Sequence, residues 1–587
     1  MPEYNELTEP AHESSTAAGR RWRLPDGWVL ISGLISLLIA LPILAVLLHV
    51  FIPAGEIWRH LGTTVLPRYL LNTFWLVIGV GIGVLVIGVG TAWLVAMCRF
   101  PGRNLMQWAL LLPLAVPTYV IAYAYTDFLQ FTGPVQSGLR DWFDWGRADY
   151  WFPNIRSLGG AITLMALVLY PYVYLLARAA FLEQSVSALE VGRTLGRGPW
   201  RLFGTIALPL ARPAIAGGTA LALMETLNDF GAVQFFGVDT FTTGIYRTWF
   251  GLGEPVAAAQ LAAILLIFVA LLILFERLSR GQAQFHNTGT KYQALPSFKL
   301  KGARAWLALT ACALPVLLGF LLPAGLLLQM AITEGDPLFG TRFMRFAGNS
   351  LLLAGVAAIL AVGLALLLSY AARINRSRVT SWSVRLAGLG YAVPGSVIAV
   401  GILIPLGYLD DRINLYTDRW FGVTVGLLFT GTLVALVYAY LVRFLAVSLN
   451  AVDASLARVT VSMDGAARTL GQSAGQTLRR VHMPMTRVSL FAAAILVFVD
   501  VMKELPATVI LRPFDFDTLA IRAYELASDE RLAQASTSAL AIVLVGIIPV
   551  IILSRAMTQS RPGHHDPDAQ DSALPASESV LAGNTKT

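Results

Sequence analysis

Long apolar stretches, separated by short polar segments, run along almost the whole chain. A transmembrane helix needs about 20 mostly apolar residues, and we count twelve stretches of that kind. They lie near 28–52, 70–97, 105–126, 158–181, 214–235, 256–275, 305–331, 347–371, 383–407, 421–442, 488–510 and 534–554. The pattern predicts an all-α membrane protein with twelve transmembrane helices.

The composition narrows the classes of protein that fit. Hydrophobic residues make up 56% of the chain, charged residues only 13%, and the mean hydropathy is +0.65. A soluble domain carries about 25% charged residues, so the composition excludes a soluble enzyme, a disordered scaffold and a secreted disulfide-rich module. Cys98 and Cys312 lie far apart in apolar surroundings and predict buried thiols rather than a disulfide framework or a metal cluster.

The distribution of Lys and Arg predicts the orientation, because cytoplasmic loops carry an excess of both. With the amino terminus in the cytoplasm, most of the 43 Lys and Arg residues fall in predicted inner segments, Arg443 after the tenth stretch among them. We therefore expect a multi-pass protein of a bacterial inner membrane with both termini in the cytoplasm. This topology explains the net charge of +8 without a nucleic-acid partner.

The chain contains an internal repeat. Arg193-Thr194-Leu195-Gly196 recurs as Arg468-Thr469-Leu470-Gly471. The same offset pairs further residues without a gap: Pro209 with Pro484, Arg212 with Arg487, Glu225 with Asp500, Asp229 with Glu504, and Arg247 with Arg522. Each copy holds an even number of spans, so the two copies are parallel repeats of six helices.

The repeat divides the chain into five parts. We expect a cytoplasmic tail at 1–27, a first repeat at 28–277, a cytoplasmic linker at 278–304, a second repeat at 305–555 and a cytoplasmic tail at 556–587. The linker is polar and basic, as an inner segment should be.

The loop after the fourth span of each copy predicts a short helix, a glycine stop, a second short helix and a proline at the membrane entry. Gly196 and Gly471 suit left-handed caps at a helix end. Pro209 and Pro484 suit the first turn of the next span. A helix–turn–helix of this kind forms a rigid projection that can transmit a push between two proteins.

These loops resemble the "EAA" loops of permease subunits in binding-protein-dependent ABC importers. The first loop matches in Glu190, Gly196 and the ending Ile206–Pro209, whereas Gly465 takes the glutamate position of the second loop and Asp464 precedes it. The resemblance implies a type I ABC importer permease fold and a substrate-binding protein on the outer side. It also implies that each loop docks on a cytoplasmic ATPase subunit, with two copies of that subunit. The residues expected there are Glu190, Arg193, Gly196, Pro209, Asp464, Gly465, Arg468, Gly471 and Pro484.

The chain has no Gly-x-x-x-x-Gly-Lys-Ser/Thr phosphate-binding loop. We therefore expect a transport subunit and not an enzyme, without a cofactor, whose ATP is hydrolysed on a separate subunit.

The fifth span of each copy carries polar and ionisable residues. They are Glu225, Asn228 and Asp229 in the first copy and Asp500, Lys503 and Glu504 in the second. A charge at the centre of a span is unfavourable by roughly 2.5–3.5 kcal/mol, so we expect these side chains to face protein or water and to line a translocation path. The alternative is that Lys503 pairs with Asp500 and the acids hold helices together.

Further stretches resemble the ferric-iron branch of these permeases, among them Asp229–Val233, Phe235–Arg247, Lys503–Thr508 and Phe516–Glu525. The resemblance implies ferric iron as cargo, delivered by a binding protein that Arg247 and Arg522 contact. Thiamine, polyamine and sulfate permeases share the same plan and stay open as alternatives. The seven histidines form no metal site within the spans, so a metal-ligand set is unknown.

Two other classes compete with this interpretation. A secondary transporter with twelve spans also explains the parallel repeat, but it does not explain the paired glycine-and-proline loops. A membrane enzyme would use Glu225 and Asp229 as acid and base, but the equivalent carboxylates Asp500 and Glu504 favour the symmetry of a path.

Overall fold

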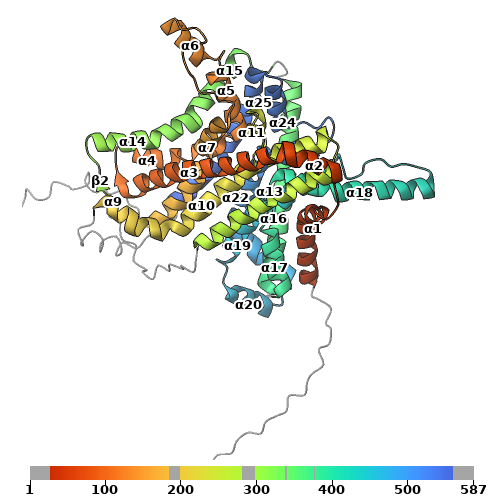
Figure 1. The fold of residues 1–587 in the computed structure, drawn as a ribbon. Coiled ribbons are helices and arrows are strands. Elements are labelled where there is room, and N and C mark those ends of the chain that lie inside the picture. The colour runs from red at the N-terminus through yellow and green to blue at the C-terminus, as the bar shows by residue number, and fades with distance from the viewer. Residues whose placement is uncertain (1–26, 184–197, 281–297, 337–339, 376, 560–587) are drawn as a thin grey trace, which may run out of the picture.

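The computed structural model describes residues 27–183, 198–280, 298–336, 340–375 and 377–559. Their fold is helical, apart from the two-residue strands β1 (Cys98–Arg99) and β2 (Phe298–Lys299), which pair in parallel (Figure 1). The sequence-based prediction of an all-α membrane protein is confirmed.

The first copy contains the elements up to residue 280. They are α1 (Gly27–His49), α2 (Gly55–Thr64), α3 (Leu66–Met97), α4 (Arg103–Ala109), η1 (Leu112–Ala115), α5 (Thr118–Leu129), α6 (Pro134–Phe143), α7 (Leu158–Glu183), α9 (Pro199–Leu202), η2 (Phe203–Ala207), α10 (Leu208–Asn228), α11 (Gly231–Phe235), α12 (Phe241–Tyr246), η3 (Arg247–Gly251) and α13 (Pro255–Arg280).

The second copy repeats this order of elements. Its elements are α14 (Ala303–Val316), η4 (Leu317–Leu321), α15 (Leu322–Thr333), α16 (Thr341–Ile374), α17 (Arg378–Ala387), η5 (Gly390–Ala392), α18 (Gly395–Phe421), α19 (Leu433–Leu456), α20 (Val461–Thr469), α21 (Ala474–Thr477), η6 (Leu478–His482), α22 (Met483–Met502), α23 (Pro506–Leu511), α24 (Leu519–Ser528) and α25 (Leu532–Gln559).

Within the described residues, ten helices are long and apolar enough to cross a membrane, and the number is twelve if each of two bent helix pairs is one span. The bends measure 92° before α5 and 116° before α18. Both fall at a Val-Pro step, Val116-Pro117 and Val393-Pro394, where the valine backbone is extended. Proline disfavours the helical conformation of the residue before it, so the same dipeptide breaks the third span of each copy.

The tenth span lies later in the chain than the apolar pattern predicts. The predicted span is 421–442, but α18 continues to Phe421 and α19 begins at Leu433. The segment between them is a loop, because the buried Asp410 carboxylate accepts hydrogen bonds from the backbone N–H groups of Leu428, Phe429 and Thr430. The apolar residues of this loop look like part of a span in the hydropathy pattern, although they are not helical.

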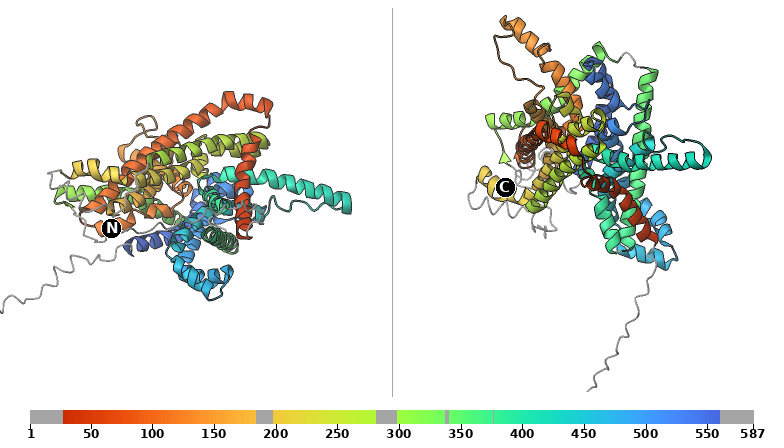
Figure 2. Two further views of the ribbon diagram at one scale, coloured as in Figure 1. Left: turned by 90° about the horizontal axis from the view of Figure 1, so that it is seen from below. Right: turned by 45° about the vertical axis from the view of Figure 1, so that its right-hand side comes forward.

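The first helix of each copy crosses to the other copy. Helix α1 packs against α17 and α18, while α14 and η4 pack against α3, α4 and α7 (Figures 1 and 2). Glycines allow the close approach, since a Cβ atom on Gly401 would lie 2.2 Å from the Pro42 carbonyl oxygen and one on Gly319 would lie 2.6 Å from that of Leu167. The two copies are therefore interleaved.

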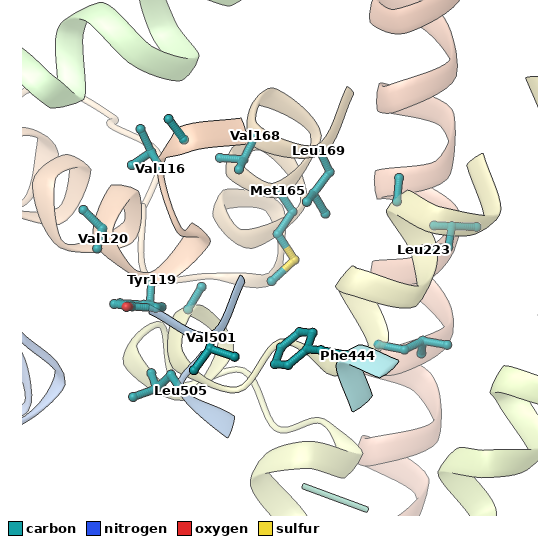
Figure 3. Packing of buried hydrophobic residues seen from close by; sticks show 14 of the residues in the cluster. Val116, Tyr119, Val120, Met165, Val168, Leu169, Leu223, Phe444, Val501 and Leu505 are labelled. Atoms are coloured by element: carbon teal, nitrogen blue, oxygen red, sulfur yellow. The ribbon is translucent and has the colours of Figure 1, made fainter. Parts of the chain in front are cut away.

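Between the copies, buried apolar side chains form a continuous core. Figure 3 shows Met165, Val168 and Leu169 of the first copy facing Phe444 and Val501 of the second. This packing surrounds a small cavity that has charged side chains in its lining, and this cavity is the candidate site.

Candidate functional site

A cavity of about 90 Å³ lies where the two copies meet. One water molecule needs a cavity volume of roughly 10–15 Å³, so this cavity has room for several water molecules. All six residues predicted for a path line it, together with one basic residue that was not predicted: Glu225, Asn228, Asp229, Asp500, Lys503, Glu504 and Arg443. The structure thus brings the two predicted sets together.

The two fifth spans end at this cavity. Helix α10 ends at Asn228 and α22 ends at Met502, and each is followed by a short helix, α11 or α23. The predicted spans 214–235 and 488–510 are therefore each interrupted. A broken helix exposes backbone groups that need partners, and polar side chains at the break supply them.

Asp229 and Glu504 cap the short helices that follow. Asp229 Oδ1 accepts hydrogen bonds from the N–H groups of Ala232 and Val233, both at 3.1 Å. Glu504 accepts from the N–H groups of Ala507 at 2.9 Å and Thr508 at 3.1 Å. Both carboxylates are buried, so their contacts are those of helix-stabilising acids.

The remaining charged residues of the fifth spans are more accessible. The Glu225, Asp500 and Lys503 side chains are 24%, 22% and 28% exposed. Lys503 Nζ lies 2.9 Å from Asp500 Oδ1, the pair that the sequence left as an alternative, and the Tyr391 hydroxyl donates to Glu225 at 3.0 Å. Glu225 and the Asp500–Lys503 pair are thus the groups that a solute in the cavity would meet.

Arg443 is the residue that sequence reasoning missed. It was assigned to a cytoplasmic loop, but it lies inside α19, is 4% exposed and contacts the carboxylates of Glu225 and Glu504. The cause of the error is the displaced tenth span. The offset of the repeat aligns Arg443 with Val168, which lies in the middle of α7. This alignment alone indicates that Arg443 lies inside a span.

The lining of the cavity carries an excess of negative charge. It contains four carboxylates and two basic side chains, so two negative charges are left over when all are ionised. Such a lining favours a cation over an anion. Among the described residues, no group of three or more His, Cys, Asp or Glu side chains is arranged to hold a metal ion.

The second predicted docking loop is a helix–turn–helix as expected. Helix α20 ends at Thr469, Gly471 has a left-handed backbone with φ of 76°, and Pro484 lies in the first turn of α22. Gly465, Arg468 and Gly471 are exposed, and α20 lies at the lower edge of the molecule in Figure 1.

Asp464 has a different role from its neighbours in this loop. Its carboxylate accepts hydrogen bonds from Arg373 Nε at 2.9 Å and lies 2.7 Å from Nε2 of the buried His482. Arg373 also donates to the carbonyl oxygens of Leu456 and Val459. We call Arg373, Asp464 and His482 the α20 clamp, since they fix α20 to α16, to the end of α19 and to η6.

Part of the first loop lies outside the described residues, including Glu190, Arg193 and Gly196. Pro209 is described and lies in the first turn of α10, as predicted. The position equivalent to His482 is Ala207, so the first loop lacks the histidine of the α20 clamp.

Arg247 and Arg522 are not equivalent in the structure, contrary to the sequence alignment. Thr240 is the N-cap of α12, and Thr518 is the N-cap of α24. The backbone carbonyl of Asp239, just before Thr240, accepts a hydrogen bond from the Asn72 side chain. In the same way, the backbone carbonyl of Asp517, just before Thr518, accepts one from the Asn349 side chain. A few residues are inserted before α24, so Arg247 aligns with Glu525 and the match with Arg522 is a coincidence of spacing.

The two arginines also have different surroundings. Arg247 pairs with Asp239, and its side chain is 45% exposed. Arg522 donates two hydrogen bonds of 3.1 Å to the buried Asp336, and its side chain is 14% exposed. Arg247 is therefore the one of these two that is open to a partner.

Comparison with known proteins gives a consistent result. Residues 85–283 match the family described as binding-protein-dependent transport system inner membrane component. The Fe(3+)-transport system permease protein FbpB 2 of Haemophilus influenzae is 29% identical over 549 residues, which cover 91% of this chain and 99% of that protein.

Two further relatives show the range of the family. The molybdenum transport system permease protein ModB of Escherichia coli is 34% identical over 206 residues, 33% of this chain and 87% of that protein. The ferric transport system permease protein FbpB of Actinobacillus pleuropneumoniae is 24% identical over 555 residues, 89% of this chain and 76% of that protein.

Proposed function

Because the chain belongs to the inner membrane components of binding-protein-dependent transport systems, and is thus a permease subunit of an ABC importer, we propose that it imports ferric iron. The observation that carries this cargo is the match to an Fe(3+)-transport permease over nearly the full length of both chains. The acidic excess of the central cavity supports it, since a cation is favoured there.

In this proposal both copies form one path, and iron passes through the cavity between α10 and α22. Glu225 and Asp500 are the accessible carboxylates that an Fe(III) ion would meet. Carboxylate oxygens are hard ligands that suit a hard cation. Asp229 and Glu504 keep the broken helices in place while the cargo passes.

The force for opening comes from two ATPase subunits on the cytoplasmic side. They bind the loops around Glu190–Trp200 and Asp464–Gln476. In the second of these loops, Gly465, Arg468 and Gly471 are exposed. Each loop continues into a fifth span, so a displacement of the loop moves the cavity end of α10 or α22. Both tails are cytoplasmic in this arrangement.

On the outer side, the binding protein delivers the cargo near Arg247. Its partly exposed guanidinium can pair with an acidic group of that protein. Arg522 makes no such contact in this proposal, because Asp336 already binds it.

The test is iron uptake by the permease reconstituted in proteoliposomes with its ATPase subunits, its binding protein and ATP. We expect uptake of ferric iron, with molybdenum, thiamine, polyamine and sulfate transported at background rates. Uptake of one of these solutes instead of iron would refute the proposed cargo.

Paired variants test whether the cavity carries the iron. The double variant Glu225→Gln/Asp500→Asn removes two accessible carboxylates, and we expect uptake to fall at least tenfold. The matched control, Asp411→Asn/Asp418→Asn, removes two charges from the exposed part of α18 and should transport at the wild-type rate. Equal uptake by both variants would show that the path lies elsewhere.

A further inference from the structure

Arg443 differs from the other residues of the cavity in how it is held. It lies in the middle of α19, and its guanidinium contacts groups of both copies. Nη2 is 3.5 Å from Glu225 Oε2 and Nη1 is 3.6 Å from Glu504 Oε1. Nη1 also donates to the Asn228 amide oxygen. The side chain thus joins the fifth span of one copy to that of the other.

The space for the guanidinium is built by a glycine. A Cβ atom on Gly395 would lie 2.9 Å from Arg443 Nη1 and 2.8 Å from Glu504 Oε1. The Gly395 N–H donates to Asn228 Oδ1 at 2.7 Å, which orients the amide oxygen toward Arg443. The first copy has Thr118 at the corresponding start of α5 and Val168 at the position of Arg443, so it supplies no equivalent cation.

The Arg443 guanidinium is buried, but not all of its N–H groups donate a hydrogen bond. Both of its carboxylate contacts are longer than 3.2 Å, the usual limit for a strong N–H···O hydrogen bond. Its buried Nε has no hydrogen-bond partner among the described residues. A buried cation with spare donors and long ion pairs can exchange partners with less loss than one with saturated hydrogen bonds.

We propose that Arg443 is a tethered counter-cation that closes the path: in the closed state it occupies the place beside Glu225 that a cargo cation takes during transport. The inference rests on the proposed function, since it concerns the gating of the same cavity. In this closed state the guanidinium pairs with Glu225 of the first copy and Lys503 pairs with Asp500 of the second, so neither accessible carboxylate is left unpaired for a small cation. Separation of α10 from α22 breaks the bridge and exposes the carboxylates to the cargo.

The test uses the complete complex, with its ATPase subunits, in liposomes that contain calcein. Entry of Mn²⁺ in the absence of ATP and binding protein quenches the dye and measures passive leak. We expect Arg443→Gln to raise the leak at least tenfold and Arg443→Lys, which keeps the charge, to raise it less than threefold. Arg385→Gln on the exposed part of α17 is the matched control and should not leak.

Size-exclusion chromatography establishes whether each variant assembles. An assembled Arg443→Gln complex with the wild-type leak would overturn the proposal. If that variant does not assemble, Glu225→Gln decides, because it removes the ion pair between Arg443 and the first copy while Glu504 still neutralises the guanidinium. We expect it to raise the leak about threefold, and an unchanged leak would equally refute the counter-cation.

Failure of this inference is distinguishable from failure of the proposed function. Iron uptake by the wild-type complex tests the function and does not depend on the leak. Wild-type iron uptake combined with leak-free Arg443 and Glu225 variants would reject the counter-cation alone.

Discussion

The two copies of the repeat contribute differently to the cavity that they share. At the fifth spans, Asn228 of the first copy corresponds to Lys503 of the second. At the fourth spans, Val168 corresponds to Arg443. Both basic side chains of the cavity thus come from the second copy. The duplicated scaffold keeps its helices in equivalent places, whereas its charges have become specialised.

The same specialisation occurs around the capping acids. In the first copy, the Thr118 hydroxyl donates to the short carboxylate of Asp229. In the second, Gly395 leaves the space that the longer Glu504 and its guanidinium partner use. Both acids accept a hydrogen bond from a threonine hydroxyl, Thr118 for Asp229 and Thr508 for Glu504, but only Glu504 also contacts a cation, Arg443. Variants that exchange these solutions test the comparison.

The largest effect should follow from Gly395→Val. Its side chain would overlap the positions of Glu504 Oε1 and Arg443 Nη1, both within 3 Å of the Cβ atom. We expect iron uptake to fall at least tenfold and the melting temperature to drop. Thr118→Val at the corresponding place loses one hydrogen bond and should reduce uptake less. Similar losses in the two variants would mean that the copies are not specialised here.

Arg522→Gln is expected to have the next largest effect, on stability. It leaves the buried Asp336 carboxylate without its guanidinium partner, and breaking a buried pair is destabilising by about 3–5 kcal/mol. Arg247→Gln should change thermal unfolding little, because its side chain is half-exposed, and should instead weaken binding of the substrate-binding protein. Calorimetry measures the stability of the Arg522→Gln and Arg247→Gln variants, and titration with the binding protein measures their affinity. Equal losses of stability and of affinity in both variants would contradict the different surroundings of the two arginines.

Asp464→Asn should weaken coupling. It removes the charge that holds Arg373 and His482, so α20 transmits less of the ATPase motion. We expect iron transported per ATP hydrolysed to fall about fivefold, measured in proteoliposomes. Arg479→Gln, an exposed change in the adjoining η6, is the control and should leave the ratio unchanged. An unaltered ratio in Asp464→Asn would show that the α20 clamp does not transmit force.

The smallest effect should come from Lys503→Asn, which gives the second copy the residue type of the first. The change removes a positive charge beside Asp500 and makes the cavity more acidic. We expect inhibition of iron uptake by Mn²⁺ to strengthen about threefold, because a nearby cation no longer repels it. Unchanged inhibition would show that the Asp500–Lys503 pair does not face the path.

Much of the site was predictable from the chain because charges in apolar segments are constrained. Glu225 and Asp500 cannot face lipid, so their repeat-related positions indicated one common cavity. The interruption of the fifth spans was not predictable from hydropathy, because Asp229 and Glu504 supply the hydrogen bonds that let an apolar segment leave the helical path. Hydropathy records burial and not backbone conformation.

The two errors have a common physical origin in loops. Arg443 was misplaced because the apolar segment before α19 is held as a loop by hydrogen bonds to Asp410, which are invisible to a pattern of side chains. Arg247 and Arg522 were matched because identical residues recur at a constant spacing, although the N-caps Thr240 and Thr518 show an insertion. Alignment of capping residues would have corrected the second error.

The exchange of first helices has a mechanical consequence. Since α1 rests on α17 and α18 of the other copy, and α14 rests on α3 and α4, neither copy can rotate without dragging a helix embedded in its neighbour. The close backbone contacts at Gly401 and Gly319 leave little slack for independent sliding. We therefore expect a rotation of one copy to displace the other as well.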